Sequence, residues 1–312
     1  MESLLMATQV VVPMAIMVCV GIVLRICKVA DAPTMKKVDN MIFKVFMPTL
    51  SFYNIYKTDF SKFDDIGYII YGVAALMILF LLAMTVIMKV VTPRPTGAAY
   101  GQAIFRSNYL IFGAAVAESI YGVGNIGIVT LLGAVAVPLY NAQAAILLET
   151  ARHGNASTKK LLLAIAKNPT VIATVIGLAV NFSGIVLPEL VIEVVQDLSG
   201  LTTPLSFLSI GVSLSIGGAV AKKGYLISAS VLRLVVIPAI FVTGAMLLGF
   251  RGQEMCALLI LFAAPTAVSS YPMAVAMDAD GDFAAQMVAY TTVFCLPTIF
   301  LWTLLLNSMS LL

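Results

Sequence analysis

The chain has 312 residues, of which 61% are hydrophobic and 11% are charged, and its mean hydropathy is +1.04. Soluble domains carry about 45–50% apolar and about 25% charged residues, so this composition excludes a soluble globular protein. The formal net charge of +3 gives no indication of a nucleic-acid partner, and we expect none.

The chain contains stretches that are long and apolar enough to cross a bilayer, which requires about 20 mostly apolar residues each. We therefore predict an all-α membrane protein of about ten transmembrane helices in contact with lipid, with no room for a soluble domain. The predicted spans cover residues 4–24, 38–56, 66–88, 98–117, 125–147, 169–186, 201–218, 225–249, 255–276 and 283–307.

A polar segment at residues 149–160 divides the chain into a first five-helix repeat, 1–148, and a second, 161–312. Twelve Lys and Arg residues fall in one set of alternate loops, and three fall in the opposite set, which is rich in Asp and Glu. The basic loops, including residues 149–160, are therefore predicted in the cytoplasm and both termini outside. An odd number of spans in each half makes the two repeats inverted, an architecture found in many secondary transporters.

Two predicted spans are interrupted by polar, chain-breaking residues at matching positions of the two halves. The fourth span contains residues 106–109 (RSNY), and the ninth contains residues 264–272 (APTAVSSYP). Unpaired backbone groups cost several kcal/mol in hydrocarbon, so irregular backbone survives there only when it is buried in protein or lines a cavity. The pair of interruptions predicts that helices 4 and 9 are broken and cross beside a binding site.

Asn108 lies about halfway along the fourth span, near the bilayer midplane, with Ser107 and Tyr109 beside it. Its amide can donate and accept hydrogen bonds, which suits both a carboxylate and free backbone groups. The alternative role for Asn108 is an interhelical hydrogen bond that only joins helices. We interpret the three residues as substrate ligands because the second half has a matching interruption.

In the ninth span, Pro265 removes a backbone donor, and hydroxyl-bearing residues surround it. A half-helix that begins after such a break presents free N–H groups to an anion. The alternative is a simple kink, which is common in membrane helices. The predicted substrate ligands of this segment are Pro265, Thr266, Ser269, Ser270 and Tyr271.

Further polar residues lie within the predicted spans. Tyr140 and Asn141 follow a proline in the fifth span and either contact the substrate or pack against the fourth span. Arg106 either neutralises an anionic substrate or extends toward the cytoplasm, and for Arg233 we expect the second arrangement. Asp282 is expected to cap the tenth helix.

Several motifs in this order and spacing resemble the auxin efflux carrier family, which includes bacterial malonate permeases and plant PIN-FORMED carriers. The resemblance covers essentially the whole chain and is sharpest after residue 160. In the first half, Ser107-Asn108 followed by Gly113 is similar to the family's fourth-span motif, although Ala114 and Ala115 stand where a proline is usual. The motifs of the second half are Asn168-Pro169, Pro188-Glu189-Leu190, Thr203-Pro204-Leu205, Ile210–Leu214, Ala264–Ala267 and Gly281-Asp282.

The resemblance implies two inverted five-helix repeats, similar to bile-acid sodium symporters. Spans 1, 2, 6 and 7 would form a scaffold, and spans 3–5 and 8–10 would form a transport domain that moves like an elevator. The resemblance also implies a small organic anion as substrate and a homodimer formed through the scaffold. The expected location is the plasma (inner) membrane.

The sequence thus predicts a secondary transporter of a small carboxylate, with no cofactor and no metal. A channel or a substrate-sensing receptor is the alternative, although a channel requires a continuous polar stripe along its pore. An intramembrane enzyme would need a nucleophile with a base, or metal ligands, within the spans. A single histidine, His153, in the polar segment argues against an enzyme.

Overall fold

The computed structural model describes residues 2–58, 66–122, 127–153, 163, 165–214 and 222–312. These residues form helices and one isolated β-bridge. Residues 154–160 of the predicted cytoplasmic segment lie outside the described residues. The helices of the first half are α1 (Glu2–Ile26), α2 (Ala32–Met41), the π-helical η1 (Ile42–Phe46), α3 (Met47–Tyr56), α4 (Gly67–Leu82), the π-helical η3 (Ala83–Ile87), α5 (Met88–Val90), α6 (Arg94–Phe105), α7 (Tyr109–Tyr121) and α8 (Gly127–His153).

The second half is also helical. Its members are α10 (Pro169–Phe182), α11 (Glu189–Gly200), α12 (Thr202–Ser213), α14 (Lys223–Val231), the π-helical η4 (Leu232–Val236), α15 (Ile237–Leu247), α16 (Gly252–Ala263), α17 (Ser270–Ala276) and α18 (Gly281–Ser308).

Helices occupy each of the ten predicted spans. Within the described residues, four continuous helical stretches are long and apolar enough to cross a membrane: 67–90, 127–153, 223–247 and 281–308. The all-helical, membrane-spanning class is therefore confirmed. One helix was not predicted: α11 lies where an acidic loop was expected, and its Glu189, Glu193 and Asp197 are exposed.

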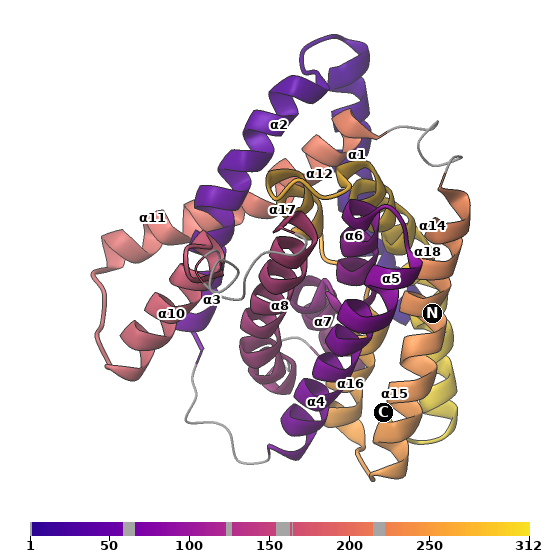
Figure 1. Ribbon diagram of the computed structural model, residues 1–312. Helices are drawn as coiled ribbons and strands as arrows, with labels where there is room; N and C mark the ends of the chain where they lie inside the picture. Colours follow the sequence, from indigo (N-terminus) through magenta and orange to yellow (C-terminus); the bar gives the residue numbers. More distant parts are fainter. Residues whose placement is uncertain (1, 59–65, 123–126, 154–162, 164, 215–221) are drawn as a thin grey trace.

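Two groups of helices lie side by side (Figure 1). In one group, α3 packs against α10 and α11, and α1 packs against α12. In the other group, α7 contacts α8 and α16, while α18 contacts α6, α14 and α17. The groups meet at α1, which contacts α7 and α18, and at α2, which contacts both α12 and α17.

Two glycines lie at the contact between α1 and α12. Gly21 of α1 and Gly211 of α12 face each other, and a Cβ atom on Gly21 would lie 2.9 Å from the Gly211 Cα. A Cβ atom on Gly211 would collide with the carbonyl oxygen of Val18. Small residues permit such close backbone approach between membrane helices, so this pair fixes α1 against α12.

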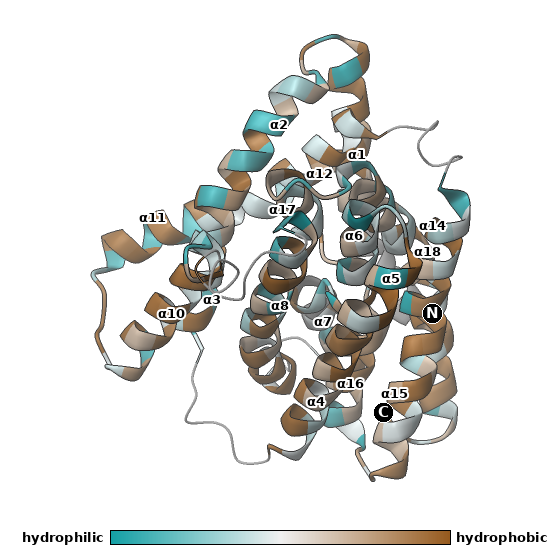
Figure 2. Ribbon diagram, viewed as in Figure 1, coloured by the Kyte–Doolittle hydropathy of each residue, from teal (hydrophilic) through white to brown (hydrophobic). Residues whose placement is uncertain are grey.

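The outer surface carries the apolar side chains expected of a protein in lipid. Figure 2 shows hydrophobic residues along α4, α10 and α15, and hydrophilic residues concentrated on α2 and α11. Large apolar side chains are widely exposed, with Ile240 of α15 at 60% and Ile78 of α4 at 57%. Lipid can cover such surface without loss, since hydrocarbon tails are as apolar as the side chains.

A polar cluster joins three helix ends at one side of the bundle. Asp280, rather than the predicted Asp282, caps α18: its Oδ1 accepts from the backbone N–H of Phe283 at 3.0 Å. Its Oδ2 accepts from Thr96 Oγ1 at 2.5 Å and from the ammonium group of Lys222. Burial raises the pKa of Asp280, but these hydrogen bonds outweigh it and lower the pKa below its usual value.

Candidate functional site

The two predicted interruptions are present, and their backbones pair with each other. Between α6 and α7, and between α16 and α17, the chain is extended, and Ser107 forms an antiparallel bridge with Thr266. The Asn108 N–H donates to the Pro265 carbonyl at 2.8 Å, and the Ala267 N–H donates to the Arg106 carbonyl at 3.0 Å. Each broken segment thus satisfies backbone groups of the other, which permits irregular backbone inside the protein.

A buried arginine of η4 binds the C-terminal ends of α6 and α16, the helices that end at the two interruptions. Arg233 is fully buried and donates to the carbonyls of Ile104, Leu261 and Ala264 at 3.0, 3.2 and 2.9 Å. The expectation that Arg233 extends to the cytoplasm was therefore wrong. Helix C-termini carry partial negative charge and unpaired carbonyls, and a single guanidinium with five donors serves both helices.

A cavity of about 310 Å³ adjoins the interruption of the first half. Its volume is at the lower end of the range of small-molecule sites, about 300–1,000 Å³. Among the described residues that line it, Arg106 is the one charged side chain. The lining consists of Met47, Leu50, Ser51, Asn54, Arg106, Ser107, Asn108, Tyr109, Leu110, Val137, Tyr140, Asn141, Thr202, Thr203, Ser206, Ala267, Val268 and Ser269.

Arg106 lies inside the protein, with 3% of its surface exposed. Its guanidinium donates to Asn141 Oδ1 at 2.7 Å and to Gln102 Oε1 at 3.1 Å, and Asn141 Nδ2 donates to Ser51 Oγ at 2.9 Å. In the part of the chain that is described, no Asp or Glu forms an ion pair with Arg106. The cavity wall therefore carries a buried positive charge that amide oxygens stabilise without neutralising it.

Several polar atoms of residues that line the cavity are buried and have no partner at full hydrogen-bond geometry. They are Ser107 Oγ, Asn108 Nδ2 and the hydroxyls of Tyr109 and Tyr140, of which the Tyr140 hydroxyl approaches Ser107. The exposed fractions of these four residues do not exceed 8%. Each group can donate a hydrogen bond, and a buried donor left unpaired costs about 1–3 kcal/mol. A ligand with several acceptor atoms would satisfy them.

Seven of the predicted site residues line this cavity, and four do not. The cavity brings together Arg106, Ser107, Asn108, Tyr109, Tyr140, Asn141 and Ser269. Thr266 instead connects helices: its hydroxyl donates to the Ala103 carbonyl at 3.0 Å, and its N–H donates to Thr291 Oγ1 at 3.1 Å. Pro265, Ser270 and Tyr271 also lie outside the lining, and Tyr271 donates to Ser213 at 2.9 Å.

The opposite wall was missed by sequence reasoning. It comes from α3, with Ser51 and Asn54, and from α12, with Thr202, Thr203 and Ser206. In each helix these polar residues are three or four positions apart, within an otherwise apolar span that also contains Pro48 or Pro204. That periodicity places side chains on one helix face and is a signal that could have identified them.

Comparison with known proteins agrees with this architecture. The chain belongs to the membrane transport protein family, which matches residues 6–303, and the predicted resemblance to auxin efflux carriers is thereby confirmed. It is also 30% identical over 154 residues to an uncharacterized transporter from Methanocaldococcus jannaschii. That match covers 48% of this chain and about half the length, 50%, of the relative. Together with the long apolar helices, family membership identifies a multi-pass membrane protein.

Proposed function

We propose that this protein is a secondary transporter of a small organic anion, bound in the cavity beside Arg106. The observation that carries the proposal is the buried guanidinium of Arg106, which faces the cavity with no carboxylate partner among the described residues. Family membership supports transport, and the charge of the cavity supports an anion. The substrate itself supplies the missing negative charge.

The energetics favour an anion over a neutral ligand. A buried charge left without a counter-charge is costly, whereas a charge-assisted hydrogen bond contributes about 1.5–3 kcal/mol. A carboxylate accepts up to about four hydrogen bonds, and Arg106, Asn108, Tyr109 and Tyr140 can supply them. The volume of about 310 Å³ suits a small molecule and leaves little room for a bulky one.

The position of the cavity supports an elevator-like mechanism. One wall belongs to α3 and α12, and the other belongs to α7, α8 and the segment before α17. The hydrogen bond between Asn141 of α8 and Ser51 of α3 crosses between these walls. In our proposal, the second wall moves past the first as a rigid body and carries the anion held by Arg106, exposing it to either side in turn.

The proposed arrangement has two inverted repeats of five spans, with both termini outside in the plasma (inner) membrane. The distribution of Lys and Arg supports this orientation. The group that contains α1, α3, α10, α11 and α12 would then be the scaffold, and we propose that it also forms the contact of a homodimer.

The test is uptake into proteoliposomes that contain the purified full chain. We expect uptake of labelled short mono- or dicarboxylates, and no uptake of the corresponding neutral amides, because only the anion can pair with Arg106. Imposed proton and sodium gradients identify the driving ion. Equal uptake of a carboxylate and its amide, or no uptake of any short carboxylate, would overturn the proposal.

A further inference from the structure

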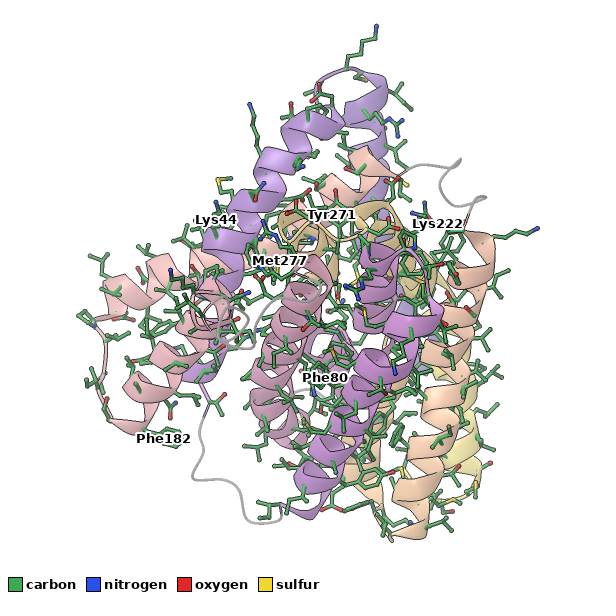
Figure 3. The ribbon with its side chains drawn as sticks, in the orientation of Figure 1. Lys44, Phe80, Phe182, Lys222, Tyr271 and Met277 are labelled. Atoms are coloured by element: carbon green, nitrogen blue, oxygen red, sulfur yellow. The ribbon has the colours of Figure 1, made fainter. Side chains whose placement is uncertain are left out.

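A buried acidic group lies outside the lining of the cavity. Asp39 of α2 is 1% exposed and packs between α12 and α17. The hydroxyl groups of Ser209 and Tyr271 approach its carboxyl group, although neither carboxyl oxygen has a partner at full hydrogen-bond geometry. Figure 3 labels Tyr271 on α17, the half-helix that follows the second interruption.

The surroundings of Asp39 supply no positive charge. Tyr271 is the titratable residue of α17, and α12 has none. The neighbouring η1 carries Lys44, which is exposed, and the lysines of α2 itself, Lys36 and Lys37, are exposed as well. No ion pair to Asp39 is found among the described residues. An ionised carboxylate in this place would be a buried charge without a counter-charge, which is strongly unfavourable.

The hydrogen bond that the Tyr271 hydroxyl makes suits the neutral form of Asp39, whereas the Ser209 hydroxyl can donate to the carboxyl group in either form. The Tyr271 hydroxyl donates its hydrogen to Ser213 Oγ at 2.9 Å, and Ser209 Oγ lies 3.4 Å from the same hydroxyl oxygen. With its hydrogen used in this way, the Tyr271 oxygen presents a lone pair to Asp39. A protonated carboxyl group can donate to that lone pair, whereas a carboxylate would face it oxygen to oxygen.

We propose that Asp39 is a proton-binding site at the contact between α2, α12 and α17. The proton comes from water, is held on a carboxyl oxygen of Asp39, and is donated in a hydrogen bond toward Tyr271. Because α17 continues from the second interruption while α2 and α12 lie beside the opposite wall, separation of α17 would hydrate the carboxyl group and release the proton. This link to transport rests on the proposed function, but proton binding itself does not.

The test needs no substrate. The melting temperature of the purified full chain in detergent is measured from pH 4 to pH 8 in choline chloride and in sodium chloride. A carboxyl group that holds its proton more tightly in the folded than in the unfolded protein loses stability as pH rises from its unfolded pKa, about 3.9, to its folded pKa, so we expect a decrease on the order of 2 °C per pH unit within that window and a flat profile above it. Asp39→Asn should abolish this slope, because the amide is always neutral. The matched control is Asp31→Asn, an exposed cap on the same helix, which should keep the slope.

Two outcomes would overturn the proposal: the same slope in wild type and Asp39→Asn, or a stabilisation by sodium that Asp39→Asn removes, which would indicate a cation site. If Asp39→Asn does not fold, infrared spectroscopy of the wild type decides. The carbonyl stretch of a protonated carboxylic acid should be present at pH 6 and should shift in Tyr271→Phe, which loses the accepting oxygen. Absence of that band would contradict proton binding. Neither measurement depends on the anion site beside Arg106.

Discussion

Removing the guanidinium of Arg233 should destabilise the contact between the two interrupted helices. This side chain is fully buried, and its three donors hold carbonyls at the ends of α6 and α16. Arg233→Met fills similar space with an apolar chain and leaves all three carbonyls unpaired. Arg233→Lys keeps the charge but replaces a planar fork by a single ammonium, so it should hold fewer of the carbonyls.

The expected cost follows from the three lost hydrogen bonds. Membrane hydrogen bonds average about 0.6 kcal/mol each, which sets a lower limit of about 2 kcal/mol. Bonds to a charged donor contribute about 1.5–3 kcal/mol each, so three of them give about 4.5–9 kcal/mol and an upper limit of about 9 kcal/mol. Arg233 is inaccessible to both water and lipid. We therefore expect Arg233→Met to lower the free energy of unfolding by an amount in the upper half of the range between these two limits, and Arg233→Lys to lower it by less.

A thiol-reactive dye provides the assay. Cys256 and Cys295 are buried, and Cys295 Sγ lies 3.6 Å from the Ala263 carbonyl at the end of α16. With the exposed Cys19 and Cys27 replaced by Ser, labelling reports the opening of this region during heating. We expect the melting temperature to decrease in the order wild type, Arg233→Lys, Arg233→Met.

The matched control is Arg251, an exposed arginine whose guanidinium also donates to backbone carbonyls, those of Met246 and Phe250. Water can replace these bonds, so Arg251→Met should melt close to the wild type. Equal melting temperatures for Arg233→Met and Arg251→Met would refute the role assigned to Arg233.

Three further predictions concern other parts of the molecule. The lowered pKa of Asp280 means that its contribution to stability is present above its unfolded value, about 3.9, and is lost as pH falls through the folded value. Wild type should therefore lose melting temperature below about pH 4 more steeply than Asp280→Asn, and parallel curves would contradict this. Gly211→Leu should cost at least about 1–3 kcal/mol by forcing α12 away from α1, and an unchanged melting temperature would contradict the close contact. A cysteine at Lys36 should react with an impermeant reagent only from the cytoplasm and one at Glu189 only from outside; the reverse pattern would exclude the proposed orientation.

Much of the helical framework could be predicted because the bilayer restricts what a chain can do. Apolar runs of about 20 residues are helical in lipid, so every predicted span contains helix, and four continuous helices are long and apolar enough to cross a membrane. The interruptions near Asn108 and Pro265 were predicted for the same reason, since polar and proline-rich segments cannot remain in lipid-exposed helices. Helix α11 escaped prediction because it is short and acidic and has no span-length apolar run.

Side-chain partners were harder to predict because they depend on tertiary contacts. The position of Arg233 near the end of a span suggested an extended side chain, yet the carbonyls that hold it lie about 130 and 30 residues away. The same holds for Ser51 and Asn54, whose role at the cavity depends on the packing of α3 beside α8. Thr266 was placed at the right segment, but its hydroxyl turns to the Ala103 carbonyl rather than to the cavity.

In the proposed transporter, Arg106 supplies the positive charge for an anionic substrate. The most direct measurement is the equilibrium dissociation constant of the short carboxylate with the highest uptake, for wild type and Arg106→Gln, alongside the melting temperature of each. Loss of a charge-assisted bond of about 1.5–3 kcal/mol predicts that binding weakens roughly ten- to a hundredfold. Arg251→Gln, an exposed arginine outside the cavity, should bind as the wild type does. Unchanged affinity in a folded Arg106→Gln protein would show that Arg106 does not bind the substrate.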